Sequence, residues 1–195
     1  MPRSFPIALK LTGRECLVVG SGDEASERAR ALAAAGARVS CVSPAPSAEL
    51  TALAGAGAIL LAERPFREQD LDGKWLAVLT DRDAELAARI AAAAEPRQIF
   101  FCATDQPEHN SFAHVALARA GLVTLAISTE GEAPALGRKL REELEQLLDR
   151  AGMAAFAEEL AELRRRTPSA DRRDVLGRAV ASVAFQGRLR LRPEP

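Results

Sequence analysis

The sequence predicts an α/β fold in which helices cover both faces of a parallel sheet. Between residues 15 and 103, short apolar runs alternate with alanine-rich segments whose apolar positions have helical spacing. Such alternation is typical of strands that run in one direction, each followed by a helix that returns along the sheet. A glycine-containing turn, VVGSGDEA at residues 18–25, joins the first run to the first helical segment.

Several elements of this part have start or stop signals of their own. The first strand ends at Gly20, the first helical segment ends at Gly36, the second strand stops at Pro44, and Ser47 is placed to cap the second helix. The predicted strands lie within residues 15–20, 38–44, 58–66, 74–80 and 98–104. The predicted helices cover residues 23–37, 47–57 and 83–95.

After Thr104 the pattern changes. Residues 105–112 form a polar loop, and two apolar runs within 112–129 follow, separated by Ala120 and Gly121. These runs favour a β-hairpin, and a helix followed by a strand is the alternative.

Helices are expected in the rest of the chain. Pro134 suits the first position of a helix that ends near residue 150. Two more helices, interrupted near Thr167, are expected within 151–187, before a loose tail at 188–195.

Composition excludes several classes of protein. The chain has 195 residues, 48% of them hydrophobic, and a net charge of −1, which gives no indication of a nucleic-acid partner. No apolar stretch suits a signal peptide or a membrane helix, so neither is expected. Three cysteines without a CxxC pair are expected to be reduced core residues of a cytoplasmic protein: Cys16, Cys41 and Cys102.

Arginines are concentrated near the C-terminus. From Arg164 onward, nine arginines stand against three acidic residues. This segment is either the solvated face of a helix or a site for a polyanionic ligand.

The glycine-containing turn predicts a Rossmann-like dinucleotide site. Gly20 allows the tight turn, Gly22 lets the backbone approach a pyrophosphate, and Ala25 is small enough for helix and strand to pack closely. The free N–H groups at the start of the helix would bind phosphate. The expected cofactor-binding residues of the turn are Gly20, Ser21, Gly22, Asp23, Glu24 and Ala25.

The usual carboxylate for the ribose is missing at the end of the second strand. Ser43 stands there instead and is the candidate for a hydrogen bond to ribose. Thr80 and Asp81, at the end of the fourth strand, complete the expected cofactor site. Residue charge at this position does not distinguish NAD from NADP.

Several motifs, in order, resemble the precorrin-2 dehydrogenases, a family that includes the N-terminal part of siroheme synthase. They are the opening stretch at 5–44, RPFREQDLDGKWLAVLTDRD, RQIFFCATDQPEHNSF and LAISTEGEAPALGRKLREELEQLL. The resemblance implies oxidation of precorrin-2 to sirohydrochlorin with NAD+, in siroheme or cobalamin biosynthesis. In many members Fe2+ is a further substrate, inserted to give siroheme.

The resemblance also implies an organisation and an assembly. We expect an NAD-binding Rossmann-like domain at 1–111, a strand hairpin and helix at 112–150 for dimerisation and substrate binding, and a helical C-terminal region at 151–195. The family works as an intertwined homodimer, and neither a membrane nor nucleic acid is expected as a partner.

Asp105 is the candidate catalytic residue. It matches the family's loop aspartate, and a carboxylate beside the ring can accept the proton that is lost when the macrocycle is oxidised. It is also the candidate metal contact, because carboxylate oxygen suits a ferrous ion. The alternative is that Asp105 stabilises a turn before Pro107. His109 and His114 are expected to be ordinary loop and sheet residues, although with Asp105 they could form a metal-binding trio.

The resemblance assigns substrate binding to hydroxyls, backbone amides and one arginine that would hold the acetate and propionate groups: Ser111, Ser128, Thr129, Gly131 and Arg138. For Arg141 a solvated helix face is preferred.

Glu130 and Glu132 depart from the family pattern and would repel a polycarboxylate. They motivate an alternative function, a tetrapyrrole carrier or sensor without catalysis. A Rossmann oxidoreductase for another small substrate is the third reading, which the absence of any tyrosine disfavours.

Overall fold

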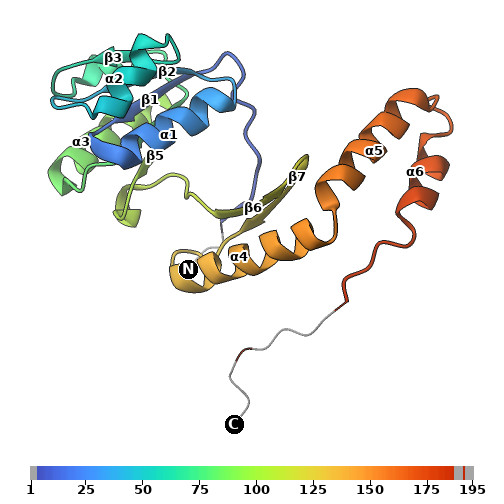
Figure 1. Cartoon of the computed structure of the whole chain (residues 1–195). Coiled ribbons are helices and arrows are strands. Elements are labelled where there is room, and N and C mark those ends of the chain that lie inside the picture. The colour runs from blue at the N-terminus through green and yellow to red at the C-terminus, as the bar shows by residue number, and fades with distance from the viewer. Residues whose placement is uncertain (1–3, 187–190, 192–195) are drawn as a thin grey trace. The chain divides into compact units, whose positions relative to one another are not determined.

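The computed structural model describes residues 4–186 and 191, and the predicted tail at 188–195 lies almost wholly outside them. The chain divides into two compact units between His114 and Val115. The two units are described separately (Figure 1).

A five-stranded, fully parallel sheet forms the centre of the first unit, as predicted. Its strand order is β3-β2-β1-β4-β5, so the direction in which the sheet is built reverses between β1 and β4. The strands are β1 (Glu15–Val19), β2 (Arg38–Val42), β3 (Leu60–Ala62), β4 (Leu76–Leu79) and β5 (Phe100–Ala103). The third strand is shorter than the apolar run that predicted it.

Alternate residues of the central strand point to opposite faces of the sheet and enter two hydrophobic cores. Cys16 and Val18 pack with the helices α1 (Gly22–Ala34) and α2 (Ala48–Gly55). Leu17 and Val19 pack on the other face with α3 (Ala84–Ala94) and the short 3-10 helix η1 (Glu68–Leu71). Both faces are therefore covered, which explains why the strands are apolar without alternation. The other 3-10 helices are η2 (Glu95–Arg97) and η3 (Pro107–His109).

The second unit begins with the predicted hairpin. β6 (Ala116–Ala120) and β7 (Val123–Ile127) are antiparallel, and Ala120 pairs with Val123 across a two-residue loop. Gly121 has a φ of +54°, which a two-residue hairpin of this kind requires.

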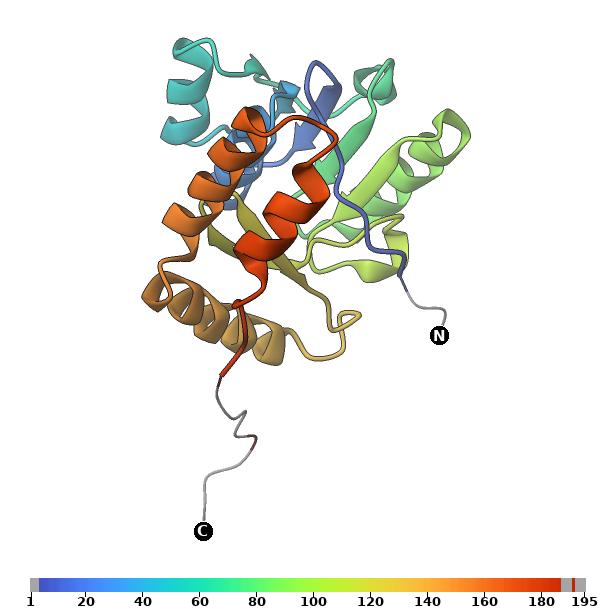
Figure 2. The same ribbon diagram turned by 90° about the vertical axis from the view of Figure 1, so that its right-hand side faces the viewer.

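Three helices complete the second unit: α4 (Pro134–Arg150), α5 (Met153–Arg166) and α6 (Arg172–Val180). Pro134 stands in the first turn of α4, as expected. The helices α5 and α6 run alongside each other (Figure 2). Neither contains a buried residue, and α4 buries only Gly137 and Leu148. The second unit thus has a small core. No helix in the described part of the chain is long and apolar enough to cross a bilayer.

The three cysteines are buried free thiols, and this predicts their reactivity. Burial raises the pKa of Cys41 to about 12 and that of Cys102 to about 11, and Cys16 is fully inaccessible. In native protein at pH 8 we expect a thiol reagent such as DTNB to react more than about 100-fold slower than with free cysteine, because thiolate is scarce and access is blocked. In guanidinium chloride all three should react at once. Rapid labelling of the native protein would contradict this arrangement.

Candidate functional site

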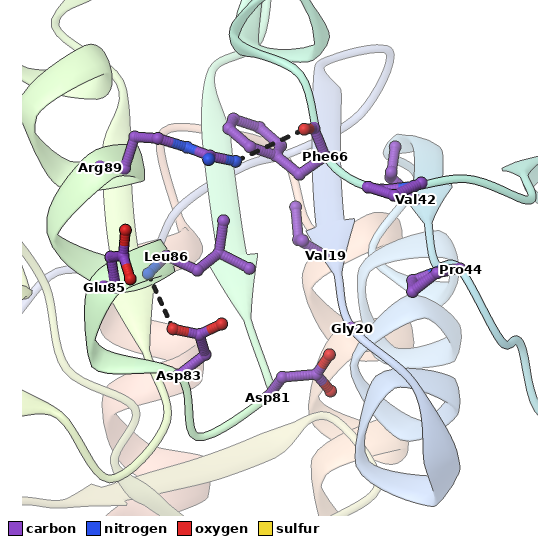
Figure 3. A pocket seen from close by; sticks show the side chains of 11 residues that line it. Val19, Gly20, Val42, Pro44, Phe66, Asp81, Asp83, Glu85, Leu86 and Arg89 are labelled. Carbon is purple, nitrogen blue, oxygen red and sulfur yellow. Dashed lines mark hydrogen bonds between the residues drawn. The ribbon is translucent and has the colours of Figure 1, made fainter.

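A cleft of about 390 Å³ opens at the carboxyl ends of β1, β2 and β4. It lies where the order of the strands reverses, the position at which open parallel sheets bind ligands. Val19, Val42 and Phe66 form apolar walls, and residues of the β4–α3 loop line the opposite side (Figure 3). Its volume is within the range of sites for small molecules and cofactors.

The turn after β1 passes very close to the end of β4. Gly20 has a φ of +138°, and a Cβ atom there would lie 2.2 Å from Thr80 Oγ1 and 2.9 Å from Asp81 Oδ1. Thr80 is buried, and its backbone N–H donates to Val19 O at 2.9 Å. Only glycine fits at position 20, for conformational and steric reasons together.

The turn is held on two sides by side chains that the sequence had singled out. The Ser21 backbone N–H donates to Asp81 Oδ1 at 2.9 Å, and the Ser21 and Ser43 hydroxyls share a hydrogen bond of 2.7 Å. Ser43 is fully buried, so in this conformation its hydroxyl supports the turn; the predicted bond to ribose would require the side chain to become accessible.

The start of α1 has free space around Gly22. A Cβ on Gly22, whose φ is +78°, would meet no atom within 4 Å. Asp23 and Glu24 are in the first turn of α1, and Ala25 is completely buried against the sheet, as its predicted packing role requires.

The sequence analysis missed the acidic wall of the cleft. Asp83 and Glu85 line it together with Asp81 (Figure 3). Asp83 also caps α3 by accepting the Leu86 N–H at 2.9 Å. The guanidinium of Arg89 lies 5.5 Å from the Phe66 ring centroid. A signal was available, because Asp83, Glu85 and Arg89 follow the end of β4 or lie on α3, the helix after it.

Asp105 follows the end of β5 and has a φ of +58°, unusual for a residue other than glycine. Its Oδ2 accepts hydrogen bonds from Arg82 Nε at 2.9 Å and Nη2 at 2.5 Å. Gln106 beside it is buried, and its Nε2 donates to the Asp81 carbonyl at 3.3 Å. The loops after β4 and β5 are thus joined. Arg82 and Gln106 were also missed: both lie within stretches that resemble the family, but an arginine between two acids and a loop glutamine do not by themselves indicate a role.

The rest of this loop is fixed along β5. Ser111 Oγ accepts the Phe101 N–H at 2.8 Å, and Asn110 Oδ1 accepts the Ala103 N–H at 2.6 Å. Ser111, a predicted substrate contact, therefore uses its hydroxyl to hold the loop against the strand.

The histidines do not join Asp105. His109 Nε2 lies 3.8 Å from Glu108 Oε1, and the His114 ring packs edge-on against Phe112 with centroids 5.2 Å apart. Among residues 4–186 and 191, no group of three or more His, Cys, Asp or Glu side chains is placed to hold a metal ion. The metal-binding trio considered from the sequence is therefore not formed in this structure.

The remaining predicted substrate residues lie together in the second unit, before and within α4. Glu130 and Gly131 have φ values of +52° and +80°, and the Glu132 N–H donates to the Thr129 carbonyl at 2.9 Å. This is the pattern of a type I′ turn. Ser128 Oγ accepts the Glu130 N–H at 3.2 Å.

Two arginines of α4 differ in their surroundings. Arg138 is exposed. Arg141 pairs with Glu145 at 3.0 Å and with Glu142 at 3.4 Å, which fits the solvated face preferred for it.

The parallel sheet, its reversal point and the glycine turn define a Rossmann-type nucleotide-binding domain. Comparison with known proteins agrees. Residues 7–116 match the family model described as "Putative NAD(P)-binding", and residues 123–147 match the model "Sirohaem biosynthesis protein central". The first model covers more than half of the chain, so the chain belongs to this NAD(P)-binding family, and residues 123–147 are similar to the central part of sirohaem biosynthesis proteins.

The chain is also similar to individual proteins of known name. The siroheme synthases of Escherichia coli (strain K12 / DH10B) and Shigella boydii serotype 18 are each 42% identical over 144 residues, 74% of this chain. The match covers 32% of each of those proteins, so this chain spans about one third of their length. Among solved structures, SirC, a precorrin-2 dehydrogenase, has the same fold, with a TM-score of 0.75 over 91% of this chain and 89% of its own, at 23% identity.

The close approach at Gly20 can be tested by substitution. Gly20→Ala should lower the free energy of unfolding by about 3 kcal/mol or more, because the new methyl group overlaps Thr80 Oγ1 in a buried site. It should also abolish dinucleotide binding. Urea unfolding followed by Trp75 fluorescence and titration calorimetry would measure both effects.

Gly57→Ala is the matched control. Gly57 also has a positive φ, +71°, but a Cβ there would meet nothing within 4 Å. This variant should lose only the backbone contribution, about 1 kcal/mol, and keep its cofactor affinity. Equal losses in the two variants would show that the contact with Thr80 does not matter.

Proposed function

We propose that this chain oxidises precorrin-2 to sirohydrochlorin with NAD+. One observation supports this most directly: the nucleotide cleft and the Asp105 loop are adjacent at the same edge of one sheet and are joined through Asp81 and Gln106. A cofactor in the cleft and a carboxylate beside it are what a dehydrogenase needs. The similarity to siroheme synthases supports a tetrapyrrole as the class of substrate.

The cleft fits a dinucleotide, and its charge favours NAD+ over NADP+. The open N-terminus of α1 suits the pyrophosphate. Asp81, Asp83 and Glu85 line the cleft, and the one cation among its described lining residues, Arg89, lies against the Phe66 ring. An additional 2′-phosphate would meet this acidic wall at close range and be repelled.

The chemistry divides between the cofactor and the chain. Oxidation removes a hydride and a proton from the macrocycle, and bound NAD+ supplies the hydride acceptor. Asp105 accepts the proton and later releases it to water. Arg82 donates two hydrogen bonds to Oδ2 of this carboxylate. Asp105 would act as the base of the reaction.

Substrate carboxylates would be bound by the second unit. We propose that Ser128, Thr129, the amide of Gly131 and the exposed Arg138 hold acetate and propionate groups. Fe2+ insertion to give siroheme is a further activity that Asp105 could assist as a carboxylate ligand. Three buried free thiols agree with a reducing, cytoplasmic location.

The proposed reaction has a direct test. Under anaerobic conditions, the purified protein with precorrin-2 and NAD+ should produce NADH and the spectrum of sirohydrochlorin. Asp105→Asn should slow the reaction by about 10²- to 10⁴-fold, the usual contribution of a general base, with NAD+ affinity unchanged. Adding Fe2+ to the product then tests siroheme formation.

Two outcomes would redirect this proposal. Tight pigment binding without NADH would support the carrier or sensor that Glu130 and Glu132 suggested. Turnover of a simple alcohol or hydroxy acid instead would indicate another oxidoreductase.

We also propose that the protein is a homodimer. In the described part of the second unit, the hairpin pairs only with itself, so β6 and β7 each have an unpaired edge, and α5 and α6 contain no buried residue. An isolated two-stranded sheet is marginally stable, and a second copy could cover these edges and helices.

Assembly can be measured without substrate. Sedimentation and light scattering should give twice the mass of one chain. The unfolding temperature should rise with protein concentration, because association stabilises the folded form by mass action. A single-chain mass with a concentration-independent unfolding temperature would rule the homodimer out.

A further inference from the structure

Arg82 contacts the proposed base in an asymmetric way. Both guanidinium hydrogen bonds, from Nε at 2.9 Å and Nη2 at 2.5 Å, go to the same oxygen of Asp105, Oδ2. A structural ion pair of this type often uses both carboxylate oxygens, as Arg64 does with Asp70 at 2.9 and 2.6 Å. At Asp105 the guanidinium leaves Oδ1 out of the pair.

The backbone at Asp105 needs an external restraint. Its φ of +58° is one that L side chains rarely adopt. Gln106 supplies part of the restraint, because its Nε2 donates to the carbonyls of Asp81 at 3.3 Å and Thr104 at 3.5 Å. Since both partners can only accept, the donor must be the amide nitrogen. These hydrogen bonds of Gln106 hold the backbone of the loop, but they do not orient the carboxylate of Asp105.

The pair is peripheral to the stability of the fold. The Arg82 and Asp105 side chains are 66% and 63% exposed. Exposed ion pairs contribute little to the free energy of unfolding, so the Arg82–Asp105 pair is not explained by its effect on stability. Arg82 also lies one residue after Asp81, whose Oδ1 accepts the Ser21 N–H of the glycine turn at 2.9 Å. The neighbouring residues Asp81 and Arg82 therefore contact the glycine turn and the proposed base, respectively.

We propose that Arg82 is a positioning residue: by binding Oδ2 it orients the Asp105 carboxylate so that Oδ1 accepts the substrate proton. This inference rests on the proposed function, in which Asp105 is the base. Arg82 lies within a stretch that resembles the family, but neither that resemblance nor the glycine turn gave it a role. Removing it should misplace the base without disturbing the cofactor cleft.

A direct role in substrate binding would have a different signature. A guanidinium that held a substrate carboxylate would lower KM, so its loss would raise KM with kcat little changed. A guanidinium that orients the base acts on the proton transfer, so its loss would lower kcat. The division of the effect between kcat and KM therefore distinguishes the two.

The first experiment measures steady-state kinetics with precorrin-2 and NAD+. Arg82→Ala should lower kcat on the order of 10- to 100-fold, the size expected when a reacting group is displaced by about 1 Å, with KM and the NAD+ dissociation constant within about twofold. Arg82→Lys should retain part of the rate, and added guanidinium ion should restore part of it to Arg82→Ala.

Arg38→Ala is the matched control. Arg38 donates from Nε to Glu15 Oε1 at 2.5 Å, and its side chain is 68% exposed. This pair is at the starts of β1 and β2, the opposite end of the strands from the site. The control should leave kcat unchanged.

A double-substitution cycle tests whether Arg82 acts through Asp105. Once Asp105→Asn has removed the base, adding Arg82→Ala should cause no further loss. Fully additive losses, or a loss confined to KM, would overturn the proposal.

A readout without substrate separates this inference from the proposed function. In NMR spectra, Arg82→Ala should shift the backbone amide signals of residues 104–106, and Arg38→Ala should leave them in place. A wild-type protein that fails to oxidise precorrin-2 would refute the proposed function, whereas the NMR comparison would still decide whether Arg82 positions Asp105. Unchanged signals at 104–106 would overturn the positioning role.

Discussion

The site depends on the close approach of two strand ends. With a Cβ at position 20 excluded by Thr80 and Asp81, the turn after β1 can lie directly against the end of β4. That contact brings the Ser21 N–H to Asp81 Oδ1, and α1 begins at the next residue. From Asp81 the connection continues through Gln106 to the loop of Asp105. The absence of a Cβ at Gly20 thus allows the loops after β1, β4 and β5 to contact one another in series.

Charge is distributed unevenly along this edge of the sheet. The cleft is lined by carboxylates, whereas the N-terminus of α1 beside it presents a positive dipole end. A dinucleotide with two phosphates and free ribose hydroxyls suits that combination, since hydroxyls can donate to carboxylates and the pyrophosphate can accept from backbone amides. The acidic residues of the cleft come from the β4–α3 loop and the first turn of α3, not from the end of β2.

The sequence predicted the fold well because local signals agreed with one another. Apolar runs, the glycine turn, Pro134 and the residues around Gly121 each pointed to the element that the structure contains. The site was predicted less completely. Gly20 and Asp81 carry family patterns, whereas Arg82 and Gln106 matter only through contacts between residues 23 and 25 positions apart. Ser43 and Ser111 show the reverse: their residue type suggested ligand contacts, but their hydroxyls hold the protein's own turn and loop.

The three-part division of the chain and the roles of the substrate residues remain predictions, because they concern a bound ligand and a second copy. The small core of the second unit has a consequence of its own. Leu148 and Ala118 are its only well-buried apolar side chains among the described residues, so little of its folding free energy comes from within. If a second chain supplies the remainder, the amount of protein that a cell synthesises sets the fraction of second units that are folded, and gene dosage acts on structure as well as on quantity.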